Sequence, residues 1–321
     1  MKRRDFLGAL AGGFGAAFFP FHASAAATLP LPMGRTSGND HFVERWSWAM
    51  GQPVHLQLFA SSPDQGLAAA AAALAELRRV EGELTLFDDA SDLSELNRQA
   101  GRKPLRVGRD LRTVLAAAAR FERLTSGAFN PAVEPLMRAW GFRTRRDSEP
   151  TSAELNEARR SVAAARILFR DNRIFLPCSD TRLDLGGIGV GYGLDRAAAT
   201  LADQGITRAF IDVSGDCLAS GAPPGEEGWL VELAGLPQTN RVPVSTRLCH
   251  GSLATSANTQ SVVHYGRAIR GHVMNPETGW PAGALTQVSV VAGNGIEADA
   301  LSTAMLVSDR PLAGVRRYYK I

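Results

Sequence analysis

Hydrophobic residues recur at helical spacing in two long stretches of the first half of the chain. In residues 64–84 and 110–124 they stand three or four positions apart, so they share one side of a helix. The apolar stripes consist of Leu67, Ala70, Leu74, Leu77 and Leu84 in the first stretch, and of Leu111, Val114, Leu115, Ala118 and Phe121 in the second. Gly127 is a stop signal for the second stretch. The pattern predicts two amphipathic helices.

Short apolar runs bounded by turn residues dominate the second half of the chain. They predict strands at 209–213, 229–233, 242–246 and 287–292, in addition to an earlier strand at 55–59. Two further helices are predicted at 196–204, ended by Gly205, and at 296–307. Because helices dominate early and strands late, this order favours an α+β fold over a repeating βαβ barrel.

The first 25 residues have the pattern of an export signal. Arg3 and Arg4 form a twin-arginine motif, residues 7–19 are apolar, and residues 23–25 read A-S-A, a small-residue cleavage site. The alternative is a disordered N-terminus, for which these three features would have to coincide. We therefore expect a periplasmic protein exported by the twin-arginine route, with an irregular lead-in at 26–45 and one domain at 46–321.

Charge distribution argues against a nucleic-acid partner, and cysteine spacing argues against a cysteine metal site. The formal charge of +3 comes from 35 basic and 32 acidic residues, and it falls to +1 without residues 1–25, because 32 basic and 31 acidic residues remain. No lysine-rich arm or arginine run interleaved with aromatics is present, so we expect no nucleic-acid partner. Cys178, Cys217 and Cys249 have no metal-binding spacing and allow at most one disulfide.

A glycine-rich segment at 184–195 reads D-L-G-G-I-G-V-G-Y-G-L-D and is predicted to join an extended run at 173–177 to the helix at 196–204. Glycine lets the backbone approach a ligand closely, and a helix N-terminus favours phosphate. The segment is not the dinucleotide fingerprint, because Tyr192 replaces the third glycine of G-x-G-x-x-G. The alternative is a tight turn where a helix packs on a sheet.

Asp299 and Thr303 stand four apart on the predicted helix at 296–307, so both lie on one face. A carboxylate beside a hydroxyl is a hard oxygen site that suits Mg²⁺. An aspartate in the first turn of a helix is also a common partner of the helix dipole, and that alternative stays open.

Two loops carry further candidates. His272 lies among the turn residues of 271–281, where a histidine can act as an acid or base, contact phosphate, or simply be solvated. Residues 125–142 join a helix end to an aromatic segment that could hold a planar ring or form ordinary core.

In their order along the chain, eight motifs resemble those of the ApbE family of FAD:protein FMN transferases. The resemblance covers roughly residues 46–307. The motifs are A-M-G at 49–51, S-D-L-S-E-L-N at 91–97 with Phe87, G-A-F-N-P at 127–131 leading to W-G-F at 140–142, D-L-G-G-I at 184–188, S-G-D at 214–216, A-T-S at 254–256, H-V-M-N-P-E-T-G at 272–279, and A-D-A-L-S-T-A at 298–304.

The resemblance implies a mixed α/β, T-fold-like architecture that binds FAD and Mg²⁺. Such enzymes transfer FMN from FAD to a Thr or Ser hydroxyl of a target protein and release AMP; the target here would be an exported redox protein, with at most peripheral membrane contact through it. By similarity, the metal ligands are Asp299, Thr303 and the backbone carbonyl of Gly187. Asp299 or His272 is the candidate base. The positions that correspond to FAD contacts are Met50, Phe87, Ala128, Phe129, Asn130, Asp184 and His272.

The chain departs from the family pattern near these positions. Val190 replaces a residue that is commonly Lys, and Asn130 and Asn275 replace aspartates, each with the loss of a charge. Ser214 and Ala257 replace glycines. The departures leave two alternatives open: a periplasmic FAD-binding protein without catalysis, and a pyrophosphatase that hydrolyses FAD to FMN and AMP.

Overall fold

The centre of the fold is a seven-stranded antiparallel sheet with the strand order β15-β14-β11-β8-β7-β3-β2. The computed structural model describes residues 26–28, 40–233, 244–259, 261–283, 286–312, 315 and 317–320. In chain order, the strands of the central sheet are β2 (His41–Ala49), β3 (Gln52–Ala60), β7 (Arg208–Val213), β8 (Asp216–Ser220), β11 (Gly251–Ala257), β14 (Gln287–Ala292) and β15 (Arg317–Lys320).

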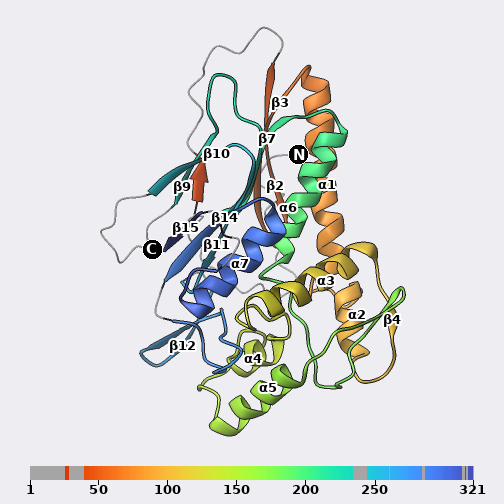
Figure 1. Cartoon of the computed structure of the whole chain (residues 1–321), viewed down its shortest axis with the longest axis vertical. Helices are drawn as coiled ribbons and strands as arrows, with labels where there is room; N and C mark the ends of the chain where they lie inside the picture. Colours follow the sequence, from red (N-terminus) through yellow and green to blue (C-terminus); the bar gives the residue numbers. More distant parts are fainter. Residues whose placement is uncertain are drawn as a thin grey trace, which may run out of the picture.

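Helices and a small sheet cover the two faces of the central sheet (Figure 1). Helices α1 (Pro63–Leu84), α6 (Gly189–Asp203) and α7 (Gly295–Ser308) lie on one face, where apolar side chains of α1 and α6 pack on β3 and β7. On the other face, Trp229 stacks on Phe210 in a cluster shared with β9 (Trp229–Leu233) and β10 (Val244–Leu248). Strand β9 also pairs with β1 (Ala26–Thr28).

Smaller elements gather at one end of the sheet, at the bottom of Figure 1. They are α2 (Asp92–Arg98), β4 (Leu105–Arg106), α3 (Arg109–Leu124), α4 (Glu134–Ala139), α5 (Ser152–Ala164), β5 (Leu168–Arg170), β6 (Arg173–Phe175), and the hairpin of β12 (Val262–Tyr265) and β13 (Ala268–Gly271). Leu111 and Phe121 of α3 share one core cluster with Leu301 of α7. This cluster joins the small end of the molecule to the helical face of the sheet, and the predicted α+β class is confirmed.

The irregular lead-in predicted at 26–45 is wrong in two places. Residues 26–28 form β1, and His41 already begins β2, which pairs with β3 through a tight turn at Met50 and Gly51. Both turn residues have positive φ, 57° and 69°, and the Glu81 carboxylate accepts hydrogen bonds from both of their N–H groups at 2.8 and 2.9 Å. The proposed export signal at 1–25 lies outside the described residues. Among the described helices, none is both long enough and apolar enough to cross a membrane.

The glycine-rich segment is helical for most of its length, which corrects the prediction of a helix that starts at Arg196. Helix α6 begins at Gly189, and Gly191 and Gly193 are buried inside it. A Cβ on Gly191 would lie 2.1 Å from the carbonyl oxygen of Gly295 in α7. The glycines therefore allow the backbones of two helices to touch. Because the partner helix is distant in sequence, the local pattern of residues does not indicate that this segment is helical.

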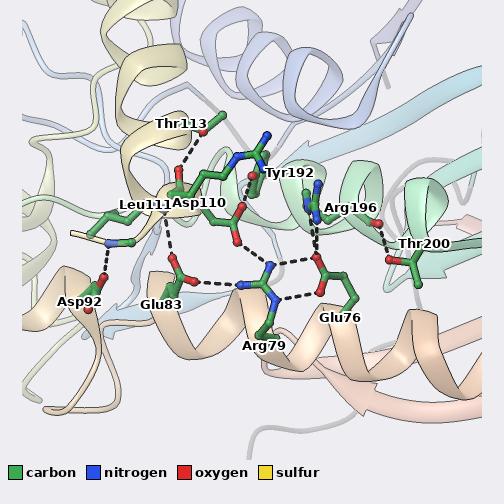
Figure 2. Close-up of polar contacts among 12 residues, drawn as sticks. Glu76, Arg79, Glu83, Asp92, Asp110, Leu111, Thr113, Tyr192, Arg196 and Thr200 are labelled. Carbon is green, nitrogen blue, oxygen red and sulfur yellow. Dashed lines mark hydrogen bonds and ion pairs between the residues drawn. The ribbon is translucent and has the colours of Figure 1, made fainter. Parts of the chain in front are cut away.

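A polar network holds α6 against α1 and α3 (Figure 2). Arg79 of α1 forms ion pairs with Glu76, Glu83 and Asp110, and the Tyr192 hydroxyl of α6 donates to Asp110. The hydrogen bond from Arg79 is the main cause that lowers the pKa of Glu76 to about 2. Burial alone would raise the pKa of Asp110, but the hydrogen bonds from Tyr192 and Arg79 outweigh burial and lower it. Tyr192, the residue that breaks the dinucleotide fingerprint, therefore anchors its helix.

Candidate active site

Asp299 and Thr303 lie on one face of α7, beside the start of α6. Asp299 is only 4% exposed, and its Oδ2 accepts a hydrogen bond from the Gly191 N–H at 3.0 Å. The Thr303 hydroxyl lies 3.1 Å from the Ser256 hydroxyl of β11. A Cβ on Gly187 would lie 2.8 Å from Thr303 Oγ1, so the Gly187 backbone borders the same hydroxyl. The structure thus brings together the three residues that the sequence suggested as metal ligands.

The Asp299 carboxylate is buried, and no ion pair with a cationic side chain is found for it among the described residues. Burial, reinforced by the neighbouring Asp216, raises the pKa of Asp299 well above its ordinary value. Burial also raises the pKa of Asp216 to about 7 and that of Asp212 to about 6. Asp216 Oδ1 accepts the Thr255 N–H at 2.8 Å. Buried charge is costly unless it is paired, so a bound cation would stabilise Asp299 in its ionised form.

The donor set fits Mg²⁺ better than a softer metal. Among the described residues, no three His, Cys, Asp or Glu side chains gather in a metal-binding group. The available ligands are instead one carboxylate, the Thr303 hydroxyl and a backbone carbonyl. Mg²⁺ prefers oxygen ligands and completes its shell with water and phosphate oxygens, so few protein ligands suffice.

The raised pKa values predict that the metal-free protein loses stability as the pH rises. A carboxyl whose pKa is higher in the folded than in the unfolded state contributes most below the unfolded pKa, and that contribution is lost as the pH rises through the folded pKa. For Asp212 the window runs from its ordinary pKa of 3.8 to about 6. The loss from this one group is about 3 kcal/mol, or less after relaxation. Urea unfolding in EDTA between pH 4 and pH 7 measures it. The Asp212→Asn variant should show a flatter profile, and an unchanged slope in that variant would contradict the assignment.

A second group of residues surrounds Asp184, three positions before Gly187. Its carboxylate pairs with Arg143 and also accepts the Gly186 N–H at 2.8 Å. The Arg143 guanidinium lies 5.4 Å from the centre of the Phe87 ring, which is 86% exposed in the loop between α1 and α2. An exposed aromatic ring beside a guanidinium can hold a planar, anionic ligand. Arg143 was not identified from the sequence, although it follows the W-G-F motif directly.

His272 follows β13 and faces the same group. Burial lowers the pKa of His272, an effect opposed by the Ser261 backbone and by the charge of Asp184. Its Nδ1 is buried and has no hydrogen-bond partner in the described part of the chain. The centres of the His272 and Phe142 rings lie 6.4 Å apart, in an edge-on arrangement. Burial therefore favours the neutral imidazole. The alternative of a solvated loop histidine does not fit a buried ring nitrogen.

The remaining candidates differ in what their side chains can reach. Ala128 and Asn130 line a cavity of about 510 Å³ together with residues 275–277 of the histidine loop. Phe129, by contrast, is 3% exposed and packs edge-on against Phe121, so its ring belongs to the core, and its N–H donates to the Thr125 hydroxyl. Met50 lies at the β2–β3 turn, with its sulfur 3.5 Å from where a Cβ on Gly193 would be. It therefore borders the first turns of α6.

The departures from the family pattern have different structural meanings. The side-chain oxygen of Asn130 accepts the Ala132 N–H at 2.8 Å, and that of Asn275 accepts the N–H groups of Glu277 and Thr278 at 2.9 and 3.0 Å. An amide oxygen fills these turn positions as well as a carboxylate oxygen does. Val190 is buried in the core between α6, α1 and the sheet, so it offers no polar contact to a ligand.

Fold and site together define an α+β enzyme-like protein that combines a buried group of oxygen ligands with an exposed aromatic ring and an arginine paired to Asp184. The ApbE family model matches residues 50–316, and the chain belongs to the ApbE family. A FAD:protein FMN transferase of Treponema pallidum is 30% identical over 250 residues, covering 72% of this chain and 68% of that protein. One of Vibrio cholerae is 27% identical over 236 residues, covering 72% and 70%.

Solved structures of the family have the same fold. The ApbE protein of Thermotoga maritima superposes with a TM-score of 0.76 at 28% identity, covering 83% of this chain and 87% of that one. The flavin transferase ApbE of Vibrio cholerae superposes with a TM-score of 0.73 at 25% identity, covering 84% and 87%.

Proposed function

We propose that this protein is a Mg²⁺-dependent FAD:protein FMN transferase that attaches FMN to a Thr or Ser hydroxyl of an exported redox protein and releases AMP. Membership of the ApbE family, whose curated relatives are FAD:protein FMN transferases, makes the chain a flavin transferase. The observation that carries the metal dependence is the buried Asp299 carboxylate near Thr303 and Gly187, which forms no ion pair with a cationic side chain of the described residues. The N-terminal twin-arginine pattern motivates a periplasmic location.

The reaction needs a hydroxyl in line with the FAD pyrophosphate. The hydroxyl oxygen forms a bond to the phosphorus of the FMN half, the bond from that phosphorus to the AMP oxygen breaks, and AMP leaves with the electron pair. Mg²⁺, bound by Asp299, Thr303 and the Gly187 carbonyl, would neutralise charge on the phosphoryl oxygens. Side chains of the protein would bind the flavin end of FAD and accept the proton of the incoming hydroxyl.

His272 suits the role of proton acceptor better than Asp299 does. A carboxylate that holds a metal ion must stay ionised and gives its lone pairs to the metal. Burial favours the neutral form of His272, which can accept a proton. We therefore assign the hydroxyl proton to His272, and the flavin end of FAD to the surface formed by Phe87, Arg143 and Asp184.

The test is FAD turnover by the purified protein, with Mg²⁺ or EDTA, in the presence and absence of an exported flavoprotein that carries a covalent FMN site. AMP is followed by chromatography and attached FMN by its fluorescence in a denaturing gel. We expect Mg²⁺-dependent AMP and an equal amount of FMN on the acceptor. AMP without an acceptor would instead indicate a pyrophosphatase. FAD that stays bound and intact would indicate a binding protein, the alternative that the buried Val190 favours.

A further inference from the structure

The two helices that carry the candidate metal ligands touch backbone to backbone. A Cβ on Gly191 of α6 would lie 2.1 Å from the carbonyl oxygen of Gly295 in α7, and a Cβ on Gly295 would lie 2.1 Å from the carbonyl oxygen of Gly191. No side chain separates the helices at this point. Any displacement of one helix is therefore transmitted directly to the other.

Two carboxylates bind across this contact in opposite directions. Asp299 of α7 accepts the N–H of Gly191, in the first turn of α6. Asp195 of α6 accepts the N–H groups of Gly295 and Ile296, in the first turn of α7, at 2.6 and 2.9 Å. The first N–H groups of a helix have no partner within the helix, so each carboxylate caps the helix opposite. These two attachments together restrict both translation and rotation of the first turns of α7 relative to α6.

We propose that Asp195 is a positioning residue for the metal site, an inference that rests on the proposed Mg²⁺ dependence. Gly187 lies just before Ile188, the N-cap of α6, whereas Asp299 and Thr303 belong to α7, so the spacing of the three ligands depends on how the two helices pack together. Core packing holds the body of α7 in place, but without the Asp195 bonds the only carboxylate tie described between its first turns and α6 is that of Asp299. The Asp195 bonds supply the second attachment and hold Thr303 beside Gly187.

A local cap on α7 separates this role from ordinary helix stabilisation. The Asn294 side chain accepts the Glu297 N–H at 3.0 Å and so caps the same first turn from within its own chain segment. It makes no tie to α6. Loss of the Asn294 cap should weaken the helix end without changing the spacing of the ligands, which makes Asn294→Ala the matched control.

The experiment measures Mn²⁺ binding to the FAD-free protein by electron paramagnetic resonance, and then KM for Mg²⁺, KM for FAD and kcat in the transfer assay. Asp195→Asn leaves one oxygen to face two N–H donors and turns an NH₂ group toward one of them. We expect 10- to 100-fold weaker Mn²⁺ binding and a matching rise in KM for Mg²⁺, as when residues that orient metal ligands are changed. At saturating Mg²⁺, kcat and KM for FAD should stay within about threefold of wild type, and Asn294→Ala should bind Mn²⁺ as wild type does.

The possible outcomes are distinct. Wild-type protein that binds no Mn²⁺ would remove the proposed metal dependence itself. Wild-type binding with equal affinity in Asp195→Asn, or an equal loss in Asn294→Ala, would overturn the positioning role alone. Should Asp195→Asn fail to fold, hydrogen exchange of the wild-type protein decides: Mg²⁺ should slow exchange of the Gly295 and Ile296 amides by about 10-fold or more, and unchanged rates would overturn the proposal.

Discussion

Replacing Asp299 with Asn should lower Mg²⁺-dependent FMN transfer by about 10³-fold or more. Asparagine keeps the shape of the side chain and one oxygen for the Gly191 N–H, but it removes the negative charge that a cation needs. A catalytic metal supplies several kcal/mol of charge stabilisation in the transition state, and each 1.4 kcal/mol is a factor of ten in rate. The rate is measured as FMN fluorescence gained by the acceptor over time.

The same substitution should make the metal-free protein more stable. Burial is the main reason why the pKa of Asp299 is raised, and a neutral side chain avoids the cost of ionising there. Urea unfolding in EDTA at pH 7 measures this gain, and Mg²⁺ should stabilise wild type but not the variant. Glu297→Gln, two positions earlier on α7 and less buried, removes one charge and is the control. A variant that still transfers FMN at the wild-type rate would exclude Asp299 as a metal ligand.

Replacing Gly191 with Ala should destabilise the protein by about 3 kcal/mol or more. The new Cβ would lie 2.1 Å from the Gly295 oxygen and 2.8 Å from the Asp299 Cβ, so α6 and α7 must separate. Because the obstacle is backbone, no rotation of a side chain relieves it. Thermal and urea unfolding measure the loss, and transfer activity should fall with it because the Gly191 N–H leaves Asp299.

Gly189 provides the matched control for this substitution. It lies in the same helix, and a Cβ there would meet only Leu84 Cδ1, at an ordinary 3.8 Å. Gly189→Ala should therefore be neutral or slightly stabilising, since alanine favours a helix more than glycine does. If both variants lost the same stability, the cause would be the glycine backbone rather than the contact between α6 and α7.

Hydrophobic periodicity predicts the two long helices, each of which has one apolar face. The stripes at 64–84 and 110–124 became α1 and α3, with Leu67 as the exposed exception in the first. Strands β7, β9 and β14 also lie where the sequence places them. Strands β8 and β11 were missed because they are short and rich in Ala and Ser, and their place in the sheet comes from neighbours on both sides.

Spacing also predicts part of the site. Asp299 and Thr303 were found because four positions make one helix face, and the motif resemblance added Gly187. Arg143, Asp195 and Asp216 were not singled out, because their partners are distant in sequence: Arg143 meets Asp184, and Asp195 meets Gly295. Such pairings depend on the packing of whole elements. No local pattern of residues encodes them.

The strand order has a consequence for when this protein can fold. The first hairpin, β2–β3, finds its neighbour in the sheet only in β7, where Phe59 pairs with Arg208 and Val54 with Val213. Most of the chain must therefore leave the ribosome before the hairpin can join a sheet, and until then its edge is exposed to wrong partners. Folding of this kind benefits from cytoplasmic chaperones and time. The proposed twin-arginine route, which moves proteins already folded, would allow both before export.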